Sequence, residues 1–153
     1  MTKNTLLFML LTVPVTVILG LLIAVLLNQS INGKTVFRAI YFLPMVVAPA
    51  AVAMVWKWLF NAEYGIINIV LGALHLPSKI QWISDPKTAL LACAIVTIWS
   101  SVGYDAILLL SGLQSISKSY YEAARIDGAN SFQQFKSITI PLVSPTLFFV
   151  LMM

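Results

Sequence analysis

Residues 6–27 read LLFMLLTVPVTVILGLLIAVLL, an apolar run without a charged side chain. A helix of about 20 apolar residues crosses the roughly 30 Å hydrocarbon core of a membrane. Pro14 and Gly20 lie inside the run, and membrane helices tolerate both residue types better than soluble helices do. Only Lys3 precedes the run, which is long enough to span and so does not resemble a secretory signal peptide. The run therefore predicts a membrane-spanning helix.

Three further apolar runs predict spans at residues 40–60, 88–113 and 138–153. Together with residues 6–27 they indicate an all-α polytopic membrane protein, with about four transmembrane helices in a single domain over residues 1–153. The last run is shorter than the roughly 20 residues that a spanning helix needs. We therefore expect the sequence to be a fragment that lacks at least the rest of its last helix.

The amino-acid composition supports the membrane assignment. Of the 153 residues, 60% are hydrophobic and 9% are charged, whereas soluble domains have about 25% charged residues. A small soluble domain buries only about two-thirds of its surface, so it could not hide this apolar excess. The apolar side chains must then face lipid or other membrane helices. The net charge of +4 is scattered along the chain, which argues against a nucleic-acid partner.

Single cysteine and histidine residues exclude two kinds of site. Cys93 is the only cysteine, so the chain has no disulfide framework and no thiolate metal site. It lies in an apolar run, and we expect it to be a small packed side chain. His75 has no Cys, Asp or Glu in a metal-binding motif near it.

Basic residues in the loops predict the orientation of the chain. The first and third loops, residues 28–39 and 114–137, share one side of the membrane and hold most of the loop Lys and Arg. The positive-inside rule favours these two loops as cytoplasmic, so the chain is expected to be a multi-pass protein of the cell membrane. Trp56, Trp58 and Trp82 then cluster at the opposite boundary, where we expect an interfacial aromatic belt.

The third loop and the start of the fourth run contain a motif with readable local structure. Residues 119–145 are SYYEAARIDGANSFQQFKSITIPLVSP. Ser119 with Glu122 three positions later predicts a capping box and a helix beginning near Tyr120. Asp127 and Gly128 predict its end, with Gly128 in the left-handed conformation.

A second short helix is predicted directly after this turn. Ser131 and Gln134 form a second possible capping box, and Phe132 and Phe135 fall on one face of the helix. Residues 114–137 should thus form a helix–turn–helix along the cytoplasmic surface. Two interpretations of it remain open at this point. It could dock on another protein, or it could be a self-capped surface element in which Glu122 only bonds its own backbone.

The same residues resemble the signature of the integral-membrane subunits of binding-protein-dependent ABC importers. That signature is Glu-Ala-Ala, three residues, Gly, nine residues, Ile, one residue and Leu-Pro. This chain keeps every spacing from Glu122 to Pro141, with Ile140 in place of the usual Leu. In the family this segment is a coupling helix that sits in a groove on the ATPase subunit. The resemblance implies ATPase coupling by the following residues: Glu122, Ala123, Ala124, Asp127, Gly128, Phe132, Phe135, Ile138 and Pro141.

The resemblance also implies partners and a substrate class. Further stretches, such as Tyr41-Phe42-Leu43-Pro44 and residues 112–116, resemble the carbohydrate branch of the family, the maltose and glycerol-phosphate type. Family members usually have about six helices of about 20 apolar residues, so the four here look like the core. The implied partners are two ATPase subunits, a second permease and an extracytoplasmic substrate-binding protein. ATP and Mg would be bound by the ATPase, and this chain would hold no cofactor and catalyse no reaction.

A polar stripe marks the third predicted span. Cys93, Thr97, Ser100, Ser101, Tyr104 and Asp105 recur at helical spacing, and Asp105 is the one acidic residue in a span. The stripe could pack against another helix through small polar residues. It could also line the substrate path, because ionisable groups within membranes usually face water or a partner. The resemblance does not decide between these interpretations.

Three alternatives to a sugar importer were weighed. An ion-coupled secondary transporter would need coupling carboxylates near the midplane, where only Asp105 is available. A membrane-embedded enzyme would need a paired acid, base or nucleophile, and the sequence shows none. An ABC importer of another solute, such as an amino acid or a polyamine, remains open from the sequence.

Overall fold

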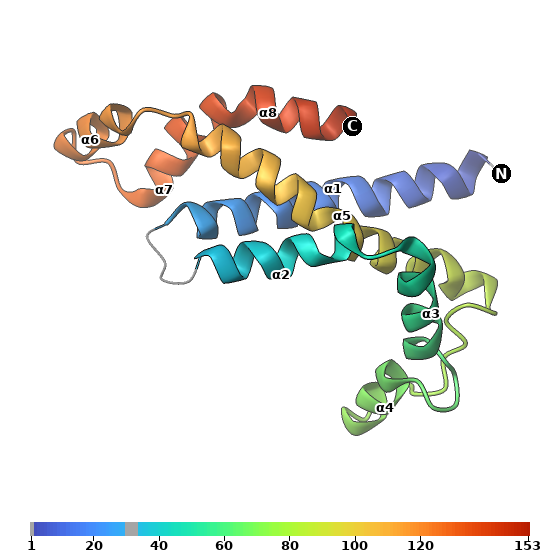
Figure 1. Cartoon of the computed structure of the whole chain (residues 1–153). Helices are drawn as coiled ribbons and strands as arrows, with labels where there is room; N and C mark the ends of the chain where they lie inside the picture. Colours follow the sequence, from blue (N-terminus) through green and yellow to red (C-terminus); the bar gives the residue numbers. More distant parts are fainter. Residues whose placement is uncertain (1, 30–33) are drawn as a thin grey trace. The chain divides into compact units, whose positions relative to one another are not determined.

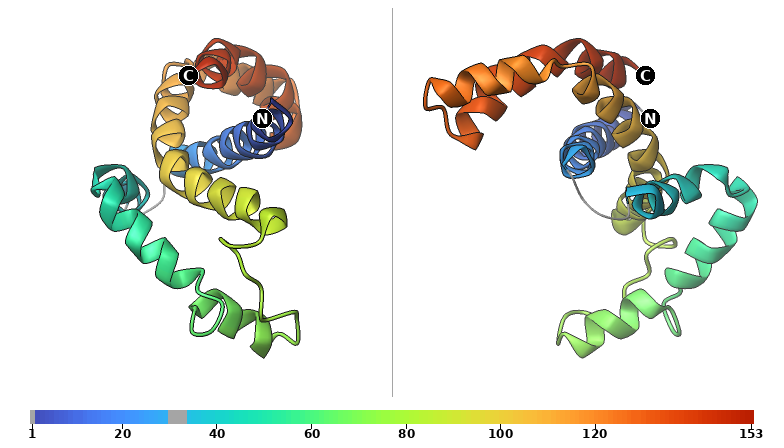
Figure 2. Two further views of the ribbon diagram at one scale, coloured as in Figure 1. Left: turned by 90° about the vertical axis from the view of Figure 1, so that its right-hand side faces the viewer. Right: turned by 60° about the vertical axis from the view of Figure 1, so that its left-hand side comes forward.

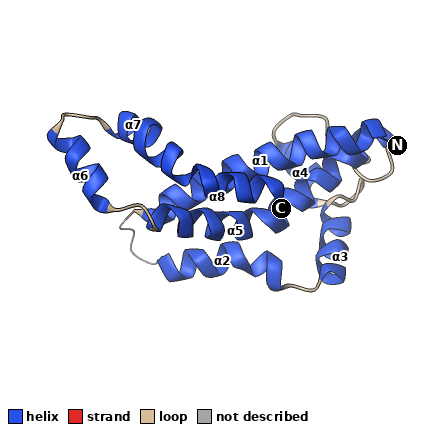
Figure 3. Ribbon diagram, turned by 90° about the horizontal axis from the view of Figure 1, so that it is seen from above, coloured by secondary structure: helices blue, strands red, loops and turns tan. Residues whose placement is uncertain are grey.

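The computed structural model describes residues 2–29 and 34–153, and every regular element within them is helical (Figures 1 and 3). In chain order these are α1 (Thr2–Asn28), α2 (Lys34–Val46), α3 (Pro49–Leu59), α4 (Ile66–Ala73), α5 (Pro86–Gln114), α6 (Lys118–Ile126), α7 (Ser131–Gln134), a π-helical turn (Phe135–Thr139) and α8 (Ile140–Met152). The all-α prediction is confirmed. Part of the first predicted loop, residues 30–33, lies outside the described residues.

Three helices are long and apolar enough to cross a membrane, at Thr2–Asn28, Pro86–Gln114 and Ser131–Met152. They contain the predicted spans 6–27 and 88–113, and most of 138–153. The predicted span 40–60 is instead broken into α2 and α3, which bend by 104° at the break. Counting this bent pair as one span gives four, the number expected.

Pro49 explains why the second span is broken. A residue before proline is disfavoured in the α conformation, because the proline ring clashes with its backbone. Ala48 has φ −55° and ψ 129°, which is extended, and Pro49 then occupies the first turn of α3. Proline is tolerated there because its missing N–H would have no partner within the helix.

The chain divides into two compact units, which are described separately. The first unit contains residues up to Pro14 and Phe42–Ser101, and the second contains Val15–Tyr41 and Val102–Met153. The long helices α1 and α5 contribute to both units.

Within the first unit, the predicted middle loop folds around one buried amide. Asn68 is only 4% exposed. Its Nδ2 donates to the carbonyls of Ala62 at 3.2 Å and Ile80 at 3.0 Å, and its Oδ1 accepts from Nε1 of Trp82 at 2.9 Å. Because the amide uses both its donors and its acceptor, it ties α4 to the chain on both sides of it.

The tryptophans of the first unit take part in a set of aromatic contacts. Trp56 stacks on Phe60 at 5.2 Å between ring centroids and meets Trp99 edge-on at 5.6 Å. Phe60, which is buried, also contacts Trp82 at 5.5 Å. Trp58 alone is largely exposed, as a belt residue would be. The rings of Trp56 and Trp82 therefore make contacts within the unit, and the aromatic belt stays a prediction.

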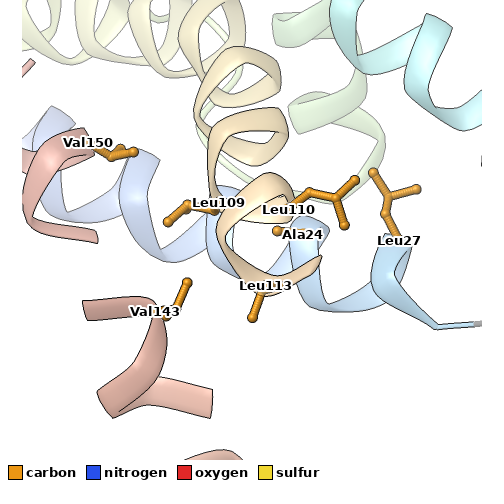
Figure 4. Close-up of a cluster of buried hydrophobic side chains, with 7 residues drawn as sticks. All are labelled: Ala24, Leu27, Leu109, Leu110, Leu113, Val143 and Val150. Atoms are coloured by element: carbon orange, nitrogen blue, oxygen red, sulfur yellow. The ribbon is translucent and has the colours of Figure 1, made fainter. Parts of the chain in front are cut away.

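The second unit has an apolar core where α1, α5 and α8 meet. Figure 4 shows its buried members: Ala24, Leu27, Leu109, Leu110, Leu113, Val143 and Val150. Leu109 and Val143 are the largest completely buried side chains among the described residues. Most apolar side chains on these helices stay exposed in the chain, as expected for surfaces that face lipid or other membrane helices. Cys93, in the first unit, is also exposed, which corrects the expectation that it is packed.

Two glycines allow the helices of the second unit to approach closely. A Cβ atom at Gly112 would lie 2.5 Å from Oγ1 and 2.9 Å from Cβ of Thr146 on α8. A Cβ atom at Gly20 would lie 3.1 Å from Cβ of Asp105 on α5. Membrane helices associate through such small residues, because lipid provides no hydrophobic drive to bring helices together.

We expect Gly112→Ala to destabilise the protein. The added methyl group must push α8 away, and overpacking of this kind costs about 1–3 kcal/mol. The thermal midpoint of the purified full-length protein in detergent should fall. Gly72→Ala is the control, since its Cβ would meet only Ser78, at 3.2 Å. Thr146→Ala should restore part of the loss, and equal midpoints for Gly112→Ala and Gly72→Ala would contradict the tight contact.

Candidate coupling loop

The helix α6 begins earlier than the sequence predicts. Its N-cap is Ser117, which is extended with φ −62° and ψ 136°, and whose Oγ accepts from the backbone N–H of Ser119 at 3.4 Å. The predicted capping box of Ser119 and Glu122 is therefore wrong, and both residues lie inside the helix. Ser117 takes the role because it is the first serine after the preceding turn and adopts the extended backbone that an N-cap needs.

The predicted end of α6 is confirmed. Asp127 is the C-cap and Gly128 has φ +81°. The N–H of Gly128 donates to the carbonyl of Arg125 at 3.1 Å, and the N–H of Ala129 donates to the carbonyl of Ala124 at 2.8 Å. These two bonds form a Schellman motif. Within the described residues, nothing apart from its chain neighbours lies within 4 Å of an added Cβ at Gly128, so the position requires glycine for its backbone conformation and not for lack of space.

The second capping box exists, but one residue earlier than predicted. The N–H of Gln133 donates to Oδ1 of Asn130 at 2.9 Å, and the N–H of Asn130 donates to Oε1 of Gln133 at 2.8 Å. Asparagine caps a helix at least as well as serine, so Asn130 displaces the predicted Ser131. Gln134 instead donates from Nε2 to the carbonyl of Ala129 at 2.8 Å.

The second short helix is not a separate surface element. It has only four residues, and it continues through the π turn into α8 (Figure 2). The helix that contains the last predicted span therefore begins at Ser131, before Ile138. Phe132 is 72% exposed, whereas Phe135 and Ile138 are half-buried. Pro141 lies directly after the π turn, near the start of α8 and inside the continuous helix.

Glu122 lies exposed on α6 with its carboxylate unpaired among the described residues. Within the described part of the chain its carboxylate has no hydrogen bond or ion pair, and the helix is capped by Ser117. The interpretation that Glu122 serves only to cap its own helix is therefore wrong. Ile126 nearby is 87% exposed. We call Glu122 and Ile126, which lie one helical turn apart on α6, the exposed face of the coupling loop.

The two alanines of the motif and Asp127 complete this region. Ala123 and Asp127 are exposed, and Ala124 is half-buried. Alanine favours helix and adds no bulk, so it leaves the surface of α6 open around Glu122. An exposed carboxylate beside large exposed apolar side chains is suited to docking on a protein that offers a basic group.

The polar stripe of the third predicted span lies on α5, and its residues belong to both units. Thr97, Ser100 and Ser101 are half-buried in the first unit. The Ser100 Oγ donates to backbone carbonyls of its own helix, those of Val96 at 2.9 Å and Thr97 at 3.0 Å. In the second unit, Tyr104 and Asp105 are also half-buried. No group of three His, Cys, Asp or Glu side chains within residues 2–29 and 34–153 is arranged to hold a metal.

Two residues of the loop were missed by sequence reasoning. The hydroxyls of Tyr121 and Thr139 are 3.0 Å apart, and Thr139 is only 7% exposed. They are 18 positions apart in the chain, so no local pattern could have paired them. The presence of a hydroxyl at a position that becomes buried was the only signal available.

Known proteins share this architecture. Residues 16–153 match the family described as "Binding-protein-dependent transport system inner membrane component". The chain is 39% identical over 146 residues to the trehalose/maltose transport system permease protein MalF of Thermococcus litoralis, covering 95% of this chain and 49% of that protein. It is 35% identical over 151 residues to the sn-glycerol-3-phosphate transport system permease protein UgpA of Agrobacterium fabrum, covering 97% and 50% respectively.

A solved structure also matches. It is a crystal structure of a bacterial alginate ABC transporter in complex with a periplasmic protein that holds an alginate pentasaccharide. The TM-score is 0.84 at 26% identity, over 95% of this chain and 51% of that one. The chain thus spans about half the length of the relatives it matches. Because the family match covers nearly all of the sequence, including the coupling loop, the chain belongs to the family of inner-membrane components of binding-protein-dependent transport systems.

Proposed function

We propose that this chain is the permease subunit of an ATP-driven importer for a sugar or sugar derivative, and that the exposed face of its coupling loop docks on an ATPase subunit. The observation that carries this proposal is the state of Glu122. It lies on a short helix whose two ends are fixed by Ser117 and Gly128, and its charge is not used within the described chain. A rigid helix that presents a free charge next to Ile126 is suited to enter a groove on a partner.

The substrate class is supported by the relatives. Their names refer to trehalose and maltose, glycerol phosphate and alginate, all of which are sugars or polyol derivatives. Such solutes are recognised by hydrogen-bonding side chains. The polar α5 stripe offers such groups at Thr97, Ser101 and Tyr104, and we propose that it forms part of the substrate path. The relatives therefore favour a sugar over the amino acid or polyamine that the sequence left open.

The proposed mechanism is alternating access. Two ATPase subunits bind ATP and Mg, close on each other and pull the coupling loops of two permeases. The path then opens toward an extracytoplasmic binding protein that delivers the substrate. A solved relative was crystallised with a periplasmic protein of this type. In this scheme the chain is a multi-pass protein of the cell membrane, its coupling loop faces the cytoplasm, and it holds no cofactor of its own.

Gly128→Val should abolish the stimulation of ATP hydrolysis by the loaded binding protein. Positive φ costs a residue other than glycine about 1–2 kcal/mol, and a β-branched side chain tolerates it worst. The Schellman turn would open and α6 would leave its docking position. ATP hydrolysis should be measured with and without binding protein, on complexes purified through a tag on the permease. Gly128→Asn is the control, because asparagine tolerates the left-handed conformation. Loss of stimulation in Gly128→Asn and not in Gly128→Val would contradict this account.

Glu122→Gln should reduce the same stimulation about tenfold or more, because a charge pair that becomes buried at the interface loses one partner. The permease should still insert in the membrane. Ser117→Ala provides the comparison. It weakens α6 by removing its N-cap and leaves Glu122 intact, so it should lower thermal stability more than stimulation. Wild-type stimulation in both Gly128→Val and Glu122→Gln would refute the coupling-loop assignment.

Asp105→Asn should reduce transport about tenfold while the subunits still assemble, if Asp105 hydrogen-bonds the substrate through its charge. Gly20→Ala is the matched packing variant, because its Cβ presses on Asp105 from α1 without changing the charge. Transport into vesicles and recovery of the complex should be measured for both. If Asp105→Asn and Gly20→Ala both lose assembly together with transport, Asp105 is a packing residue. Normal transport and assembly in Asp105→Asn would remove it from the path.

A further inference from the structure

The π turn marks the place where the coupling loop joins the last span. Phe135–Thr139 forms a π helix between α7 and α8, and the N–H of Ile140 donates to the carbonyl of Phe135, five residues back. Pro141 follows directly. In a regular α-helix the proline ring would clash with the carbonyl four residues earlier. The wider π turn relieves this crowding, and such turns often occur at functional positions.

A side-chain hydrogen bond connects α6 to this turn. Tyr121 is half-buried on α6, between the exposed residues Tyr120 and Glu122. Its hydroxyl lies 3.0 Å from Oγ1 of Thr139, the buried last residue of the π turn. Oγ1 of Thr139 also lies 3.5 Å from the carbonyl of Gln134, at the start of the turn. The Tyr121–Thr139 bond therefore joins the inward side of the coupling helix to the base of the last span.

The rest of the inward side of α6 is not packed solid. A cavity of about 530 Å³ lies beside Tyr121 and Thr139. Its walls include Asn28 at the end of α1, Leu113 on α5 and Arg125 on α6. Close-packed contacts transmit displacement between elements, whereas open space does not. The Tyr121–Thr139 bond crosses beside this open space, so it offers a direct route by which displacement of α6 can reach the π turn, in addition to the chain connections at the two ends of α6.

We propose that Tyr121 and Thr139 are positioning residues for coupling, because their hydrogen bond is the joint through which displacement of α6 moves the π turn and α8. The inference rests on the proposed coupling function. Glu122 and the exposed face bind the ATPase in that scheme, and Tyr121 passes the movement inward. The π turn is the compliant element, since its hydrogen bonds already depart from the α-helical pattern.

Tyr121→Phe and Thr139→Val in the full importer test this proposal. Each variant keeps the shape of the side chain and removes one hydroxyl. Stimulation of ATP hydrolysis by the loaded binding protein should fall about threefold to tenfold, the effect of one hydrogen bond. The number of substrate molecules transported per ATP should fall as well. Recovery of the assembled complex and its ATP hydrolysis without binding protein should stay at wild-type levels.

The controls separate a joint from a merely structural contact. Thr139→Ser keeps the hydroxyl and should retain coupling, and Tyr120→Phe removes a hydroxyl from the exposed neighbour and should also retain it. The double variant of Tyr121→Phe with Thr139→Val should be no worse than either single variant, because both remove the same bond.

Three results would overturn the proposal. These are normal coupling in Tyr121→Phe and Thr139→Val, additive losses in the double variant, and loss of assembly in both single variants. If Gly128→Val and Glu122→Gln lose stimulation while Tyr121→Phe does not, only this inference fails. If none of these three variants loses it, the coupling function itself fails.

Discussion

The structure depends on one constraint, that hydrocarbon offers no partner for a backbone N–H or C=O group. A chain in which 60% of the residues are hydrophobic must satisfy these groups within each element. Helices do so locally, and the regular elements of the described residues are all helical. The constraint has its largest effect where a helix is interrupted, because each interruption leaves backbone N–H and C=O groups that need another hydrogen-bond partner.

The prolines decide where two of these interruptions occur. Pro49 breaks the second span, and the freed backbone falls in a short extended link at Ala48. Pro141 has a milder effect. It follows a π turn that keeps the helix from Ser131 to Met152 continuous. One proline therefore produces a bent pair of helices, and the other produces a compliant site inside a single helix at the base of the coupling loop.

Local chemistry made much of the fold predictable, and long-range contacts limited the rest. The apolar runs located α1 and α5 to within a few residues, and Gly128 was correctly predicted to be left-handed with the end of α6 beside it. The predicted capping box of α6 is replaced by a simple N-cap at Ser117, and the second box lies one residue earlier than predicted, because several residues in each stretch can cap a helix and only the folded backbone selects one. The break at Pro49 was missed, since proline within a membrane helix is often tolerated. The aromatic contacts of Trp56 and Trp82 and the Tyr121–Thr139 pair join distant residues, which hydropathy cannot reveal.

The coupling loop combines stiffness and freedom in a way that suits force transmission. Ser117, the Schellman turn at Gly128 and the Asn130–Gln133 capping box satisfy the exposed helix ends from within the loop. These bonds fix the helix ends locally, and the cavity beside α6 leaves open space on its inner side. A helix that was packed firmly on the bundle could not move relative to it, and a disordered loop could not transmit a displacement. A helix whose end N–H and C=O groups are paired within the loop can move as a unit. The Tyr121–Thr139 hydrogen bond and the chain connections can then transmit that movement to α8.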